Sequence, residues 1–458
     1  MGRSIEKIHI YHTNDIHSHF ESWPQISRLL SDRKDEHRKA GEACYLFDIG
    51  DHIDRSHPFT EGTKGKGNIK LLNEAGYDAV TIGNNEGVTM SKESLSSLYE
   101  DANFDVVLGN LVDMQGELPE WAVPSVVYVT AEGTRVGVIG ATAEYIQFYA
   151  KLGWQVRPPR EQLRGLAERL APETDIIICL SHMGLTEDER LALESPYIDV
   201  ILGAHTHHLF LEGKFVQGTL LAATGKYGQY TGHVTVEFDS LKKHIKKMSA
   251  TVYPTEKLPV IEEDIRRVNE LIVEGKRSLD IPVFYNPERL MQNLFATSPL
   301  SSFFGKAIIA HTEADCGMFN AGIFLGNLEA GWVTKGDIHS LLPHPINLCV
   351  VTLDGTELLE IYELSFNEEW PKVKIKGLGF RGALMGAMIF ERLYKNKKGT
   401  LFAGNREVVS GEKYTLATLD MFTFGFFYPS LKNADKEYYM PELLRDIFGI
   451  YGRNYFKE

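Results

Sequence analysis

The first half of the chain repeatedly places metal-binding side chains directly after short apolar runs. The five runs cover residues 8–11, 45–49, 79–82, 176–180 and 200–202. The side chains that follow them and could bind a metal ion are Asp15, His17, Asp51, Asn84, His182, His205 and His207. Their oxygen and imidazole donors suit a divalent ion such as Mn²⁺, Zn²⁺ or Fe²⁺, and no thiolate stands among them to select a softer metal.

The order of these motifs, rather than any single one, supports the prediction. A pair such as Asp15 and His17 is usually a chance occurrence on the protein surface, and Gly50-Asp51 alone is more often a turn. Residues just past the carboxyl ends of parallel strands, however, converge on one crevice of an α/β sheet. Five such motifs in succession therefore predict a divalent-metal site rather than a hydrogen-bonded core.

The elements that must position these side chains follow a βα pattern up to about residue 240. Charged segments at 25–38 and 162–170 separate the apolar runs and have the character of helices. Polar and apolar residues then alternate over 233–238, which predicts a strand with one solvated face.

A break between Pro254 and Pro259 divides the chain. The apolar residues after it recur at helical spacing, at Ile261, Ile265, Val268, Leu271 and Ile272. This stripe predicts a connecting helix. We therefore predict a metal-binding domain over 1–250, a linker with this helix over 251–279, and a second domain over 280–458.

Composition excludes some classes of protein. The 458 residues include 48 Lys and Arg against 62 Asp and Glu, a formal charge of −14, whereas a general nucleic-acid binder needs a basic surface. Apolar runs stay short of the ~20 residues of a membrane span, and the N-terminus lacks the apolar stretch of a signal peptide. The four cysteines stand far apart, so we expect reduced thiols in a cytoplasmic protein that binds neither nucleic acid nor membrane.

The five motifs resemble the five blocks of the calcineurin-like metallophosphoesterases. Within that superfamily, the opening His-Thr-Asn-Asp-Ile-His at 12–17 resembles the branch of 5'-nucleotidases, 2',3'-cyclic phosphodiesterases and UDP-sugar hydrolases. The resemblance covers essentially the whole chain. It implies an α/β fold with a four-layer α/β/β/α sandwich, followed by a smaller α/β C-terminal domain of the 5'-nucleotidase type.

Residue by residue, the resemblance implies a site for two divalent metal ions. The implied ligands are Asp15, His17 and His207 for one ion and Asn84, His182 and His205 for the other, with Asp51 bridging the two. Two ions about 3.5–4 Å apart can generate a hydroxide from bound water and stabilise both ends of an in-line displacement. We therefore expect a phosphoesterase that hydrolyses a small phosphorylated substrate, a nucleotide or nucleotide derivative, by attack of a metal-bound hydroxide.

One block departs from the family pattern. Residues 83–86 read Gly-Asn-Asn-Glu where the family has Gly-Asn-His-Glu, and Val88 stands in place of an Asp. Asn85 can donate a hydrogen bond to a phosphoryl oxygen but cannot hand over a proton, and general acid–base catalysis contributes typically about 10²–10⁴-fold. Slow turnover is therefore expected unless another histidine takes over this role. The candidates for that are His12, His52 and His57.

The second domain departs where the family would contact a nucleoside. The loop around Asn320 resembles the family's Asn-Gly-Gly-Gly-Ile-Arg loop but lacks the arginine, and Phe426 replaces an aspartate of a later block. Phe422 and Phe426 are candidates to stack on a base, and Arg381 is a candidate to replace the lost charge. The alternatives are a buried core strand over 422–428 and an ordinary surface arginine.

These departures keep two other functions open. All of them run in the direction of weaker catalysis, which is what a protein that binds metals and nucleotides without turnover would show. The second alternative is a hydrolase of a non-phosphate ester, since related dimetal sites accept other tetrahedral anions.

Overall fold

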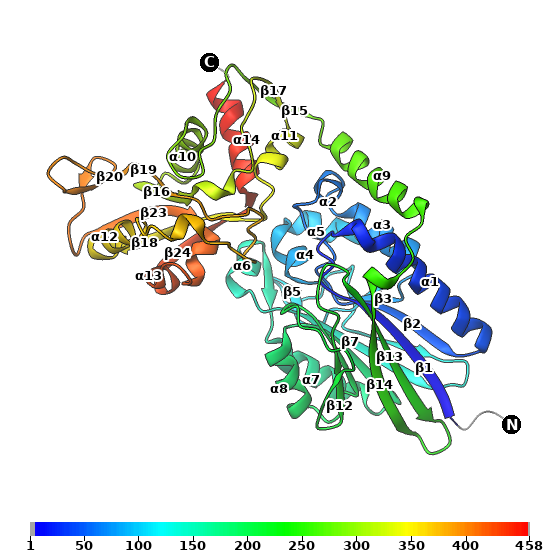
Figure 1. Ribbon diagram of the computed structural model, residues 1–458. Coiled ribbons are helices and arrows are strands. Elements are labelled where there is room, and N and C mark those ends of the chain that lie inside the picture. The colour runs from blue at the N-terminus through cyan, green and yellow to red at the C-terminus, as the bar shows by residue number, and fades with distance from the viewer. Residues whose placement is uncertain (1–4, 457–458) are drawn as a thin grey trace. The chain divides into compact units, whose positions relative to one another are not determined.

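The computed structural model describes residues 5–456, which divide into two compact units, Met1–Gly275 and Lys276–Glu458 (Figure 1). The division falls inside helix α9 (Glu262–Ser278). Each unit has its own mixed sheets and its own buried core, and each is described by itself.

The first unit contains two six-stranded sheets. In the first sheet the order is β14-β13-β1-β2-β3-β4, with β1 to β4 parallel and β13 antiparallel to both of its neighbours. Its strands are β1 (Ile5–Thr13), β2 (Ala43–Asp48), β3 (Ala79–Val80), β4 (Asp105–Val106), β13 (Tyr230–Asp239) and β14 (His244–Pro254). The predicted strand over 233–238 is confirmed and lies in β13.

In the second sheet the order is β11-β12-β10-β9-β7-β6. Its strands are β6 (Ser125–Val129), β7 (Arg135–Thr142), β9 (Ile176–His182), β10 (Val200–Gly203), β11 (Lys214–Val216) and β12 (Thr219–Ala222). The four central strands are parallel, and an antiparallel strand closes each edge. The metal-binding motifs therefore all lie at the carboxyl ends of parallel strands.

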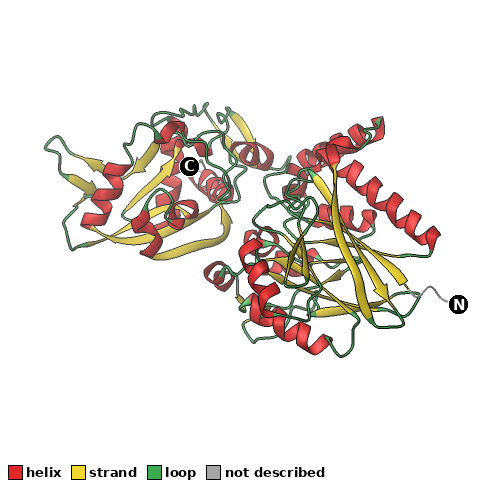
Figure 2. Cartoon of the chain, turned by 60° about the horizontal axis from the view of Figure 1, so that its bottom comes forward, coloured by secondary structure: helices red, strands yellow, loops and turns green. Residues whose placement is uncertain are grey.

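The two sheets face each other across one apolar layer. Ile10 and Phe47 of the first sheet and Ile178 and Leu202 of the second are all buried in it. Outside the first sheet α1 (Trp23–Ala40) packs on β2 and α3 (Lys66–Ala75) packs beside α1, while α7 (Pro159–Leu170) and α8 (Leu185–Glu194) cover the second sheet. Figures 1 and 2 show these layers, and the predicted α/β/β/α sandwich is confirmed.

The helices predicted over 25–38 and 162–170 are confirmed in α1 and α7. Each has a proline in its first turn, where its missing N–H leaves no hydrogen bond unmade. Helix α1 ends at Gly41, which takes a left-handed φ of 69° that a residue with a Cβ atom rarely adopts. Local sequence signals thus suffice to start and stop these two helices.

Helix α9 lies where the connecting helix was predicted, and its apolar stripe is only partly buried. Leu271 is buried, but Ile261 and Ile265 are exposed. The first turn of the helix is held by an ion pair between Asp264 and Arg28 of α1. Near its other end, Gly275 approaches the backbone so closely that a Cβ atom there would lie 2.2 Å from the backbone nitrogen of Phe59. Charge and close packing therefore fix this helix where a continuous apolar face does not.

The second unit is a smaller α/β domain. Its main sheet has the order β19-β16-β23-β18-β24, and helices α10 (Pro299–Thr312), α12 (Gly355–Leu364) and α14 (Leu444–Tyr455) pack on it (Figure 2). The strands are β16 (Cys316–Asn320), β18 (Asn347–Asp354), β19 (Met388–Glu391), β23 (Lys413–Leu419) and β24 (Asp435–Leu443). A two-stranded sheet joins β15 (Pro282–Asn286) to β17 (Gly331–Thr334), which leads into α11 (Lys335–Leu341).

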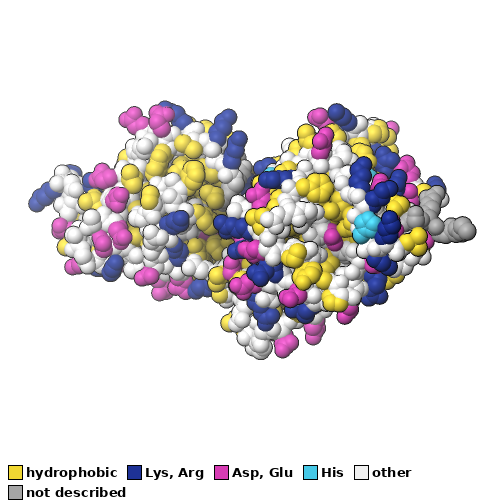
Figure 3. Space-filling view, turned by 90° about the horizontal axis from the view of Figure 1, so that it is seen from below, with side chains coloured by type: hydrophobic (Ala, Val, Ile, Leu, Met, Phe, Trp, Pro, Cys, Tyr) yellow, Lys and Arg dark blue, Asp and Glu magenta, His cyan; other side chains and the backbone are white. Residues whose placement is uncertain are grey.

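The surface mixes charges of both signs. Basic and acidic side chains lie interspersed over the face that Figure 3 shows, instead of gathering into a basic stripe there. Within residues 5–456, no helix combines the length and the apolar character that crossing a bilayer requires. The four cysteines are free thiols, and three of them are buried.

The packing between the two sheets gives a first testable prediction. A Cβ atom at Gly140 of β7 would lie 2.2 Å from the carbonyl oxygen of Val107, so we expect Gly140→Ala to lower the free energy of unfolding by about 1–3 kcal/mol. The control is Gly165→Ala inside α7, where only the flexible end of Arg169 lies near. This change should raise the free energy of unfolding by about 0.5–1 kcal/mol. Urea unfolding followed by circular dichroism measures the free energy of unfolding of both variants. Equal values for the two variants would contradict the close contact between Gly140 and Val107.

Candidate metal centre

The structure brings the seven predicted ligand side chains together in the first unit. They stand at or just after the carboxyl ends of β1, β2, β3, β9 and β10. Two overlapping groups have ligand atoms that all lie within 4.8 Å of one another, namely Asp15, His17 and His207, and Asp15, Asp51 and His182. Asp15 belongs to both groups, so the two form one cluster.

The carboxylates of Asp15 and Asp51 form the centre of this cluster. His17 Nε2 lies 3.7 Å from Asp15 Oδ1 and 3.6 Å from Asp51 Oδ2. His182 Nε2 lies 3.4 Å from Asp51 Oδ2, and His207 Nε2 lies 3.4 Å from Asp15 Oδ1. Three imidazole nitrogens therefore point at two carboxylates.

Asn84 and His205 extend the cluster on the side of His182. His205 Nδ1 lies 2.8 Å from Asn84 Oδ1, and the backbone nitrogen of His205 donates to Asp15 Oδ2 over 3.1 Å. The ring centroids of His182 and His205 are 5.3 Å apart. These three side chains are the set that the family resemblance implies for the second ion.

The backbone of the cluster is unusual because five of the seven residues have a positive φ. These are Asp15 (50°), His17 (49°), Asp51 (51°), His205 (72°) and His207 (56°). Such conformations cost on the order of 1–3 kcal/mol each for residues other than glycine and concentrate at functional sites. Loop-to-loop hydrogen bonds hold the strain, since Asp15 N donates to Gly50 O over 3.0 Å and His17 N donates to Asp51 O over 2.8 Å.

Glu86 supports the cluster from behind. Its Oε2 accepts hydrogen bonds from the backbone nitrogens of Gly83 (2.8 Å) and Asp51 (3.0 Å), and its Oε1 accepts one from Ile53 (2.9 Å). Gly83 is required here, because a Cβ atom on it would lie 2.1 Å from Asp51 Oδ1. The carboxylate of Asp51 is thus fixed by its neighbours and not by its own rotamer preference.

His182 shows that the cluster is built for a cation. Its ring is fully buried, and its Nδ1 donates to the carbonyl oxygen of Ile49 over 2.6 Å, which leaves the lone pair on Nε2. Nε2 has no hydrogen-bond partner among the described residues and faces Asp51. A metal-binding histidine whose other nitrogen donates to a backbone carbonyl has this same arrangement. The residues present therefore fit divalent ions.

Charges inside the cluster depend on one another. Burial raises the pKa of Asp15 and Asp51, but hydrogen bonds and charges from His17, His207 and His182 outweigh it, so both pKa values fall below the ordinary value. Burial lowers the pKa of His182, yet the negative charges of Asp51 and Asp15 raise it to about 10. The buried carboxylates thus require adjacent positive charge, from protons or from metal ions.

Comparison with known proteins identifies the family. Residues 8–209 match the calcineurin-like phosphoesterase family, and residues 284–388 match the C-terminal domain of 5'-nucleotidases. The chain is 39% identical over 453 residues to the uncharacterized metallophosphoesterase YunD of Bacillus subtilis, which covers 96% of this chain and 98% of the relative. The chain belongs to the calcineurin-like metallophosphoesterases. Its C-terminal domain places it in the 5'-nucleotidase family.

More distant relatives agree with this assignment. The 5'-nucleotidase of Vibrio parahaemolyticus is 22% identical over 473 residues, which cover 89% of this chain and 82% of that protein. The crystal structure of a putative 5'-nucleotidase from Staphylococcus aureus matches with a TM-score of 0.69 at 16% identity, over 97% of this chain and 96% of that one. This structural likeness shows the shared fold. Calcineurin-like phosphoesterases bind dinuclear metals, and the cluster described above is the candidate for such a site in this metallophosphoesterase.

Asn85, which replaces the family histidine, is tied into the cluster. Its backbone nitrogen donates to Asp51 Oδ1 over 2.7 Å. Its side-chain nitrogen lies 2.7 Å from His17 Nδ1 and 3.1 Å from the carbonyl oxygen of Ile53. Both hydrogens of the Asn85 amide are used in these two contacts. A contact between Asn85 and a phosphate therefore stays a prediction, and it requires one of the two hydrogen bonds to break.

The three histidines considered as substitutes for the family histidine have structural contacts. His12 is buried against Gly232, and His52 is buried edge-on to Trp23. Burial lowers the pKa of both imidazoles to about 3, which keeps them neutral. His57 accepts a hydrogen bond from the Phe59 backbone and caps helix α2 (Pro58–Gly62). These contacts do not make any of the three a proton donor for a leaving group.

Sequence reasoning missed three residues that shape the centre. Besides Glu86, Asp54 places Oδ2 3.8 Å from His17 Nδ1, where it adds negative charge beside the imidazole. The Tyr227 backbone nitrogen donates to the Asp15 carbonyl over 2.7 Å, and its ring lies edge-on to His17. Glu86 belongs to the Gly-Asn-Asn-Glu block at 83–86, so the sequence offered a signal for its role. No motif in the sequence pointed to Tyr227.

The predicted substrate residues lie in the second unit. Asn320 is buried and donates to the Met385 carbonyl over 2.7 Å, and the backbone nitrogen of Arg381 donates to His344 Nδ1 over 2.8 Å. Phe422 is fully buried, whereas Phe426 is 82% exposed, so the two phenyl rings do not share one environment. Stacking on a base and replacement of the lost charge stay predictions.

The segment over 422–428 is not the core strand considered as an alternative. It begins in a short 3-10 helix (Asp420–Phe424), which ends at Gly425 with a left-handed φ of 81°. This turn separates buried Phe422 from exposed Phe426, which is why the cluster of aromatic residues does not alternate as a strand would.

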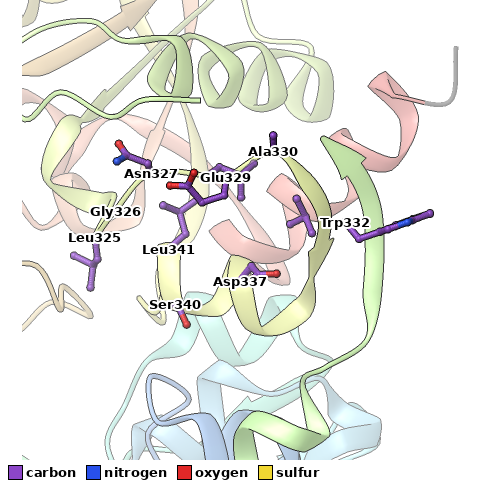
Figure 4. Close-up of a pocket in the computed structure, with 11 residues that line it drawn as sticks. Leu325, Gly326, Asn327, Glu329, Ala330, Trp332, Asp337, Ser340 and Leu341 are labelled. Carbon is purple, nitrogen blue, oxygen red and sulfur yellow. The ribbon is translucent and has the colours of Figure 1, made fainter. Parts of the chain in front are cut away.

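A hollow in the second unit follows the loop that lacks the family arginine (Figure 4). It has a volume of about 280 Å³, and its lining includes Leu325, Asn327, Trp332 and the carboxylates of Glu329 and Asp337. The described residues that line it include no lysine or arginine. The hollow therefore lacks the positive charge that a phosphate group would need.

The contacts of Glu86 give a prediction for this metallophosphoesterase. Glu86→Gln puts an NH₂ group against backbone N–H donors, so at least one of the bonds that hold Asp51 is lost. We expect metal affinity to fall about 10–100-fold, as for other groups that orient metal ligands. Competition with a chelating dye measures this, and Glu100→Gln, an exposed glutamate paired with Lys66, is the control. Unchanged affinity in Glu86→Gln would show that Asp51 does not depend on these bonds.

Proposed function

We propose that this protein is a dimetal phosphoesterase that hydrolyses nucleotides or nucleotide derivatives. One observation supports it above the others, which is the convergence of Asp15, Asp51 and three imidazole nitrogens in a buried cluster. A protein without a bound cation has little reason to hold five of the seven predicted ligand residues in left-handed conformations at one point, namely Asp15, His17, Asp51, His205 and His207.

The proposed division of ligands follows the contacts. Asp15, His17 and His207 would hold one ion, and Asn84, His182 and His205 the other, with Asp51 between them. When bound, two such ions lower the pKa of a water molecule and stabilise both oxygens of an in-line displacement. The carbonyl oxygen of Ile49 fixes the proton of His182 on Nδ1, the nitrogen that faces away from the ions.

Electrostatics favour a phosphorylated substrate at this place. Two carboxylates and two divalent ions leave a formal charge of +2, which would attract a phosphate although the whole chain carries −14. The nucleotide part of the proposal rests on the C-terminal domain, which matches that of 5'-nucleotidases. The hollow of the second unit, lined by carboxylates, is not part of the proposed phosphate site.

A second candidate function is supported by the departure at Asn85 and Val88. Without the family's His–Asp pair, a protein could bind metal and nucleotide and turn over little. The hydrogen bonds of Asn85 to Asp51 and toward His17 support this alternative, because they give Asn85 a role in the cluster that needs no proton transfer.

Metal dependence is the first test of the proposed function. Full-length protein is stripped with a chelator, reloaded with Mn²⁺, Zn²⁺ or Co²⁺, and assayed with nucleotides, cyclic nucleotides and nucleotide sugars. We expect phosphate or sugar-phosphate release only after reloading, and loss of that release in Asp51→Asn. Stoichiometric metal uptake without any release would favour the second candidate, and no uptake at all would contradict both.

Restoring the family pair separates the two candidates. In an enzyme limited by the missing proton donor, Asn85→His with Val88→Asp should raise kcat for substrates with poor leaving groups by about 10²-fold. Val88→Asp alone is the matched control, since a carboxylate without the imidazole donates no proton at neutral pH. An active wild type whose rate falls in the double variant would instead show that Asn85 is needed to hold His17.

A further inference from the structure

A second cluster of histidines lies on the outer face of the first sheet. Ile10 and Val234 face the layer between the sheets, and because side chains alternate along a strand, His9 of β1 and His233 of β13 face the opposite side. His37, in the last turn of α1, lies against them there. One ring nitrogen from each of the three histidines lies within 4.8 Å of the other two.

Glu42 orders the protons of this cluster. Its Oε2 lies 3.1 Å from His9 Nε2 and 3.1 Å from His37 Nδ1, so these two nitrogens carry hydrogens and donate to it. The lone pairs are left on His9 Nδ1 and His37 Nε2. His37 Nε2 accepts a hydrogen bond from the Tyr11 hydroxyl group over 3.1 Å, which a metal ion would have to displace. His9 Nδ1 lies 2.9 Å from His233 Nε2. A carboxylate that fixes the far nitrogens of several imidazoles is the usual partner of metal-binding histidines.

The cluster is in the protonation state that metal ions require. Burial lowers the pKa of His9 to about 4 and that of His233 to about 3, so both are neutral near pH 7. Partial burial opposes ionisation of Glu42, but the hydrogen bond from His37 lowers its pKa. Neutral imidazoles beside a carboxylate are ready to bind a cation without releasing protons.

A hollow next to the cluster adds negative potential. It has a volume of about 190 Å³ and is lined by Ile5, Glu6, Lys7, Gly41, Glu42 and Glu132. Three glutamates against one lysine favour cations in this hollow. Glu42 belongs to both the hollow and the histidine cluster, so it connects the cluster to the place where a cation would gather.

We propose that His9, His37 and His233 bind a divalent transition-metal ion such as Zn²⁺, at a site separate from the dinuclear centre. Three imidazoles are an established donor set for zinc and leave the fourth position to water. The rings of His9 and His37 now stack 3.7 Å apart with planes 17° apart, whereas a shared ion must lie in the plane of each ring. Binding therefore turns the His37 ring, which stands in the last turn of α1 with its side chain 14% exposed, out of the stack.

Such an ion would join elements that are distant in the chain. It would tie the end of α1 to β1 and β13, and β1 leads directly into Asp15 and His17. Since the ion binds the folded chain and not the unfolded one, it would raise the melting temperature of the first unit.

The test uses the full chain with the dinuclear centre removed. In Asp15→Asn/Asp51→Asn, which lacks both carboxylates of the dinuclear centre, we expect about one Zn²⁺ per chain after gel filtration, measured by elemental analysis, and a higher melting temperature with zinc than without it. Adding His37→Gln should abolish both effects. The matched control adds His244→Gln, which removes an exposed histidine of β14 and should change neither.

Two results would overturn the proposal, namely no zinc on the double variant or the same zinc content after His37→Gln. If the double variant does not fold, as judged by circular dichroism, wild type is compared with His37→Gln and with His233→Gln. A loss of one zinc per chain in both supports the site, and equal contents overturn it. These outcomes do not depend on hydrolysis, so failure of the proposed activity would leave the zinc result readable.

Discussion

The carboxylates of Asp15 and Asp51 are buried close together, and they remain charged only while positive charge lies beside them. An unpaired buried charge costs several kcal/mol, so the cluster has to supply cations or protonated imidazoles at this point. His17, His182 and His207 do so with nitrogens within 4 Å of the carboxylates. Much of the architecture of the first unit follows from meeting this requirement at a single place.

The strands deliver the charged groups, and the loops aim them. Parallel strands of two sheets end near one another, and the loops after β1, β2 and β10 then turn through left-handed residues whose side chains point at the centre. Three backbone hydrogen bonds to Glu86 and the bare backbone of Gly83 keep Asp51 from relaxing. The strain is therefore maintained by the surrounding packing and not by the loops themselves, as expected for a site organised before its ligand arrives.

This metallophosphoesterase departs from the family pattern at Asn85, not at the predicted metal ligands. All seven ligand types are present, but Asn85 replaces a histidine that could move a proton. The structure gives Asn85 another task, since it bonds to Asp51 and lies against His17. We therefore expect the rate and the metal affinity both to depend on this side chain.

Local signals in the sequence determined the strands and helices of the sandwich, the family, and the order of the metal-binding residue types. Apolar runs, helix caps and motif order act over a few residues, so they can be recognised without coordinates. Only the tertiary structure decided that Glu86 and Tyr227 support the centre, that Asn85 bonds to Asp51, that Phe422 is buried while Phe426 is exposed, and that His9, His37 and His233 meet. Each of these depends on contacts between residues that strand register and helix packing bring together, and such contacts have no local pattern by which the sequence could reveal them.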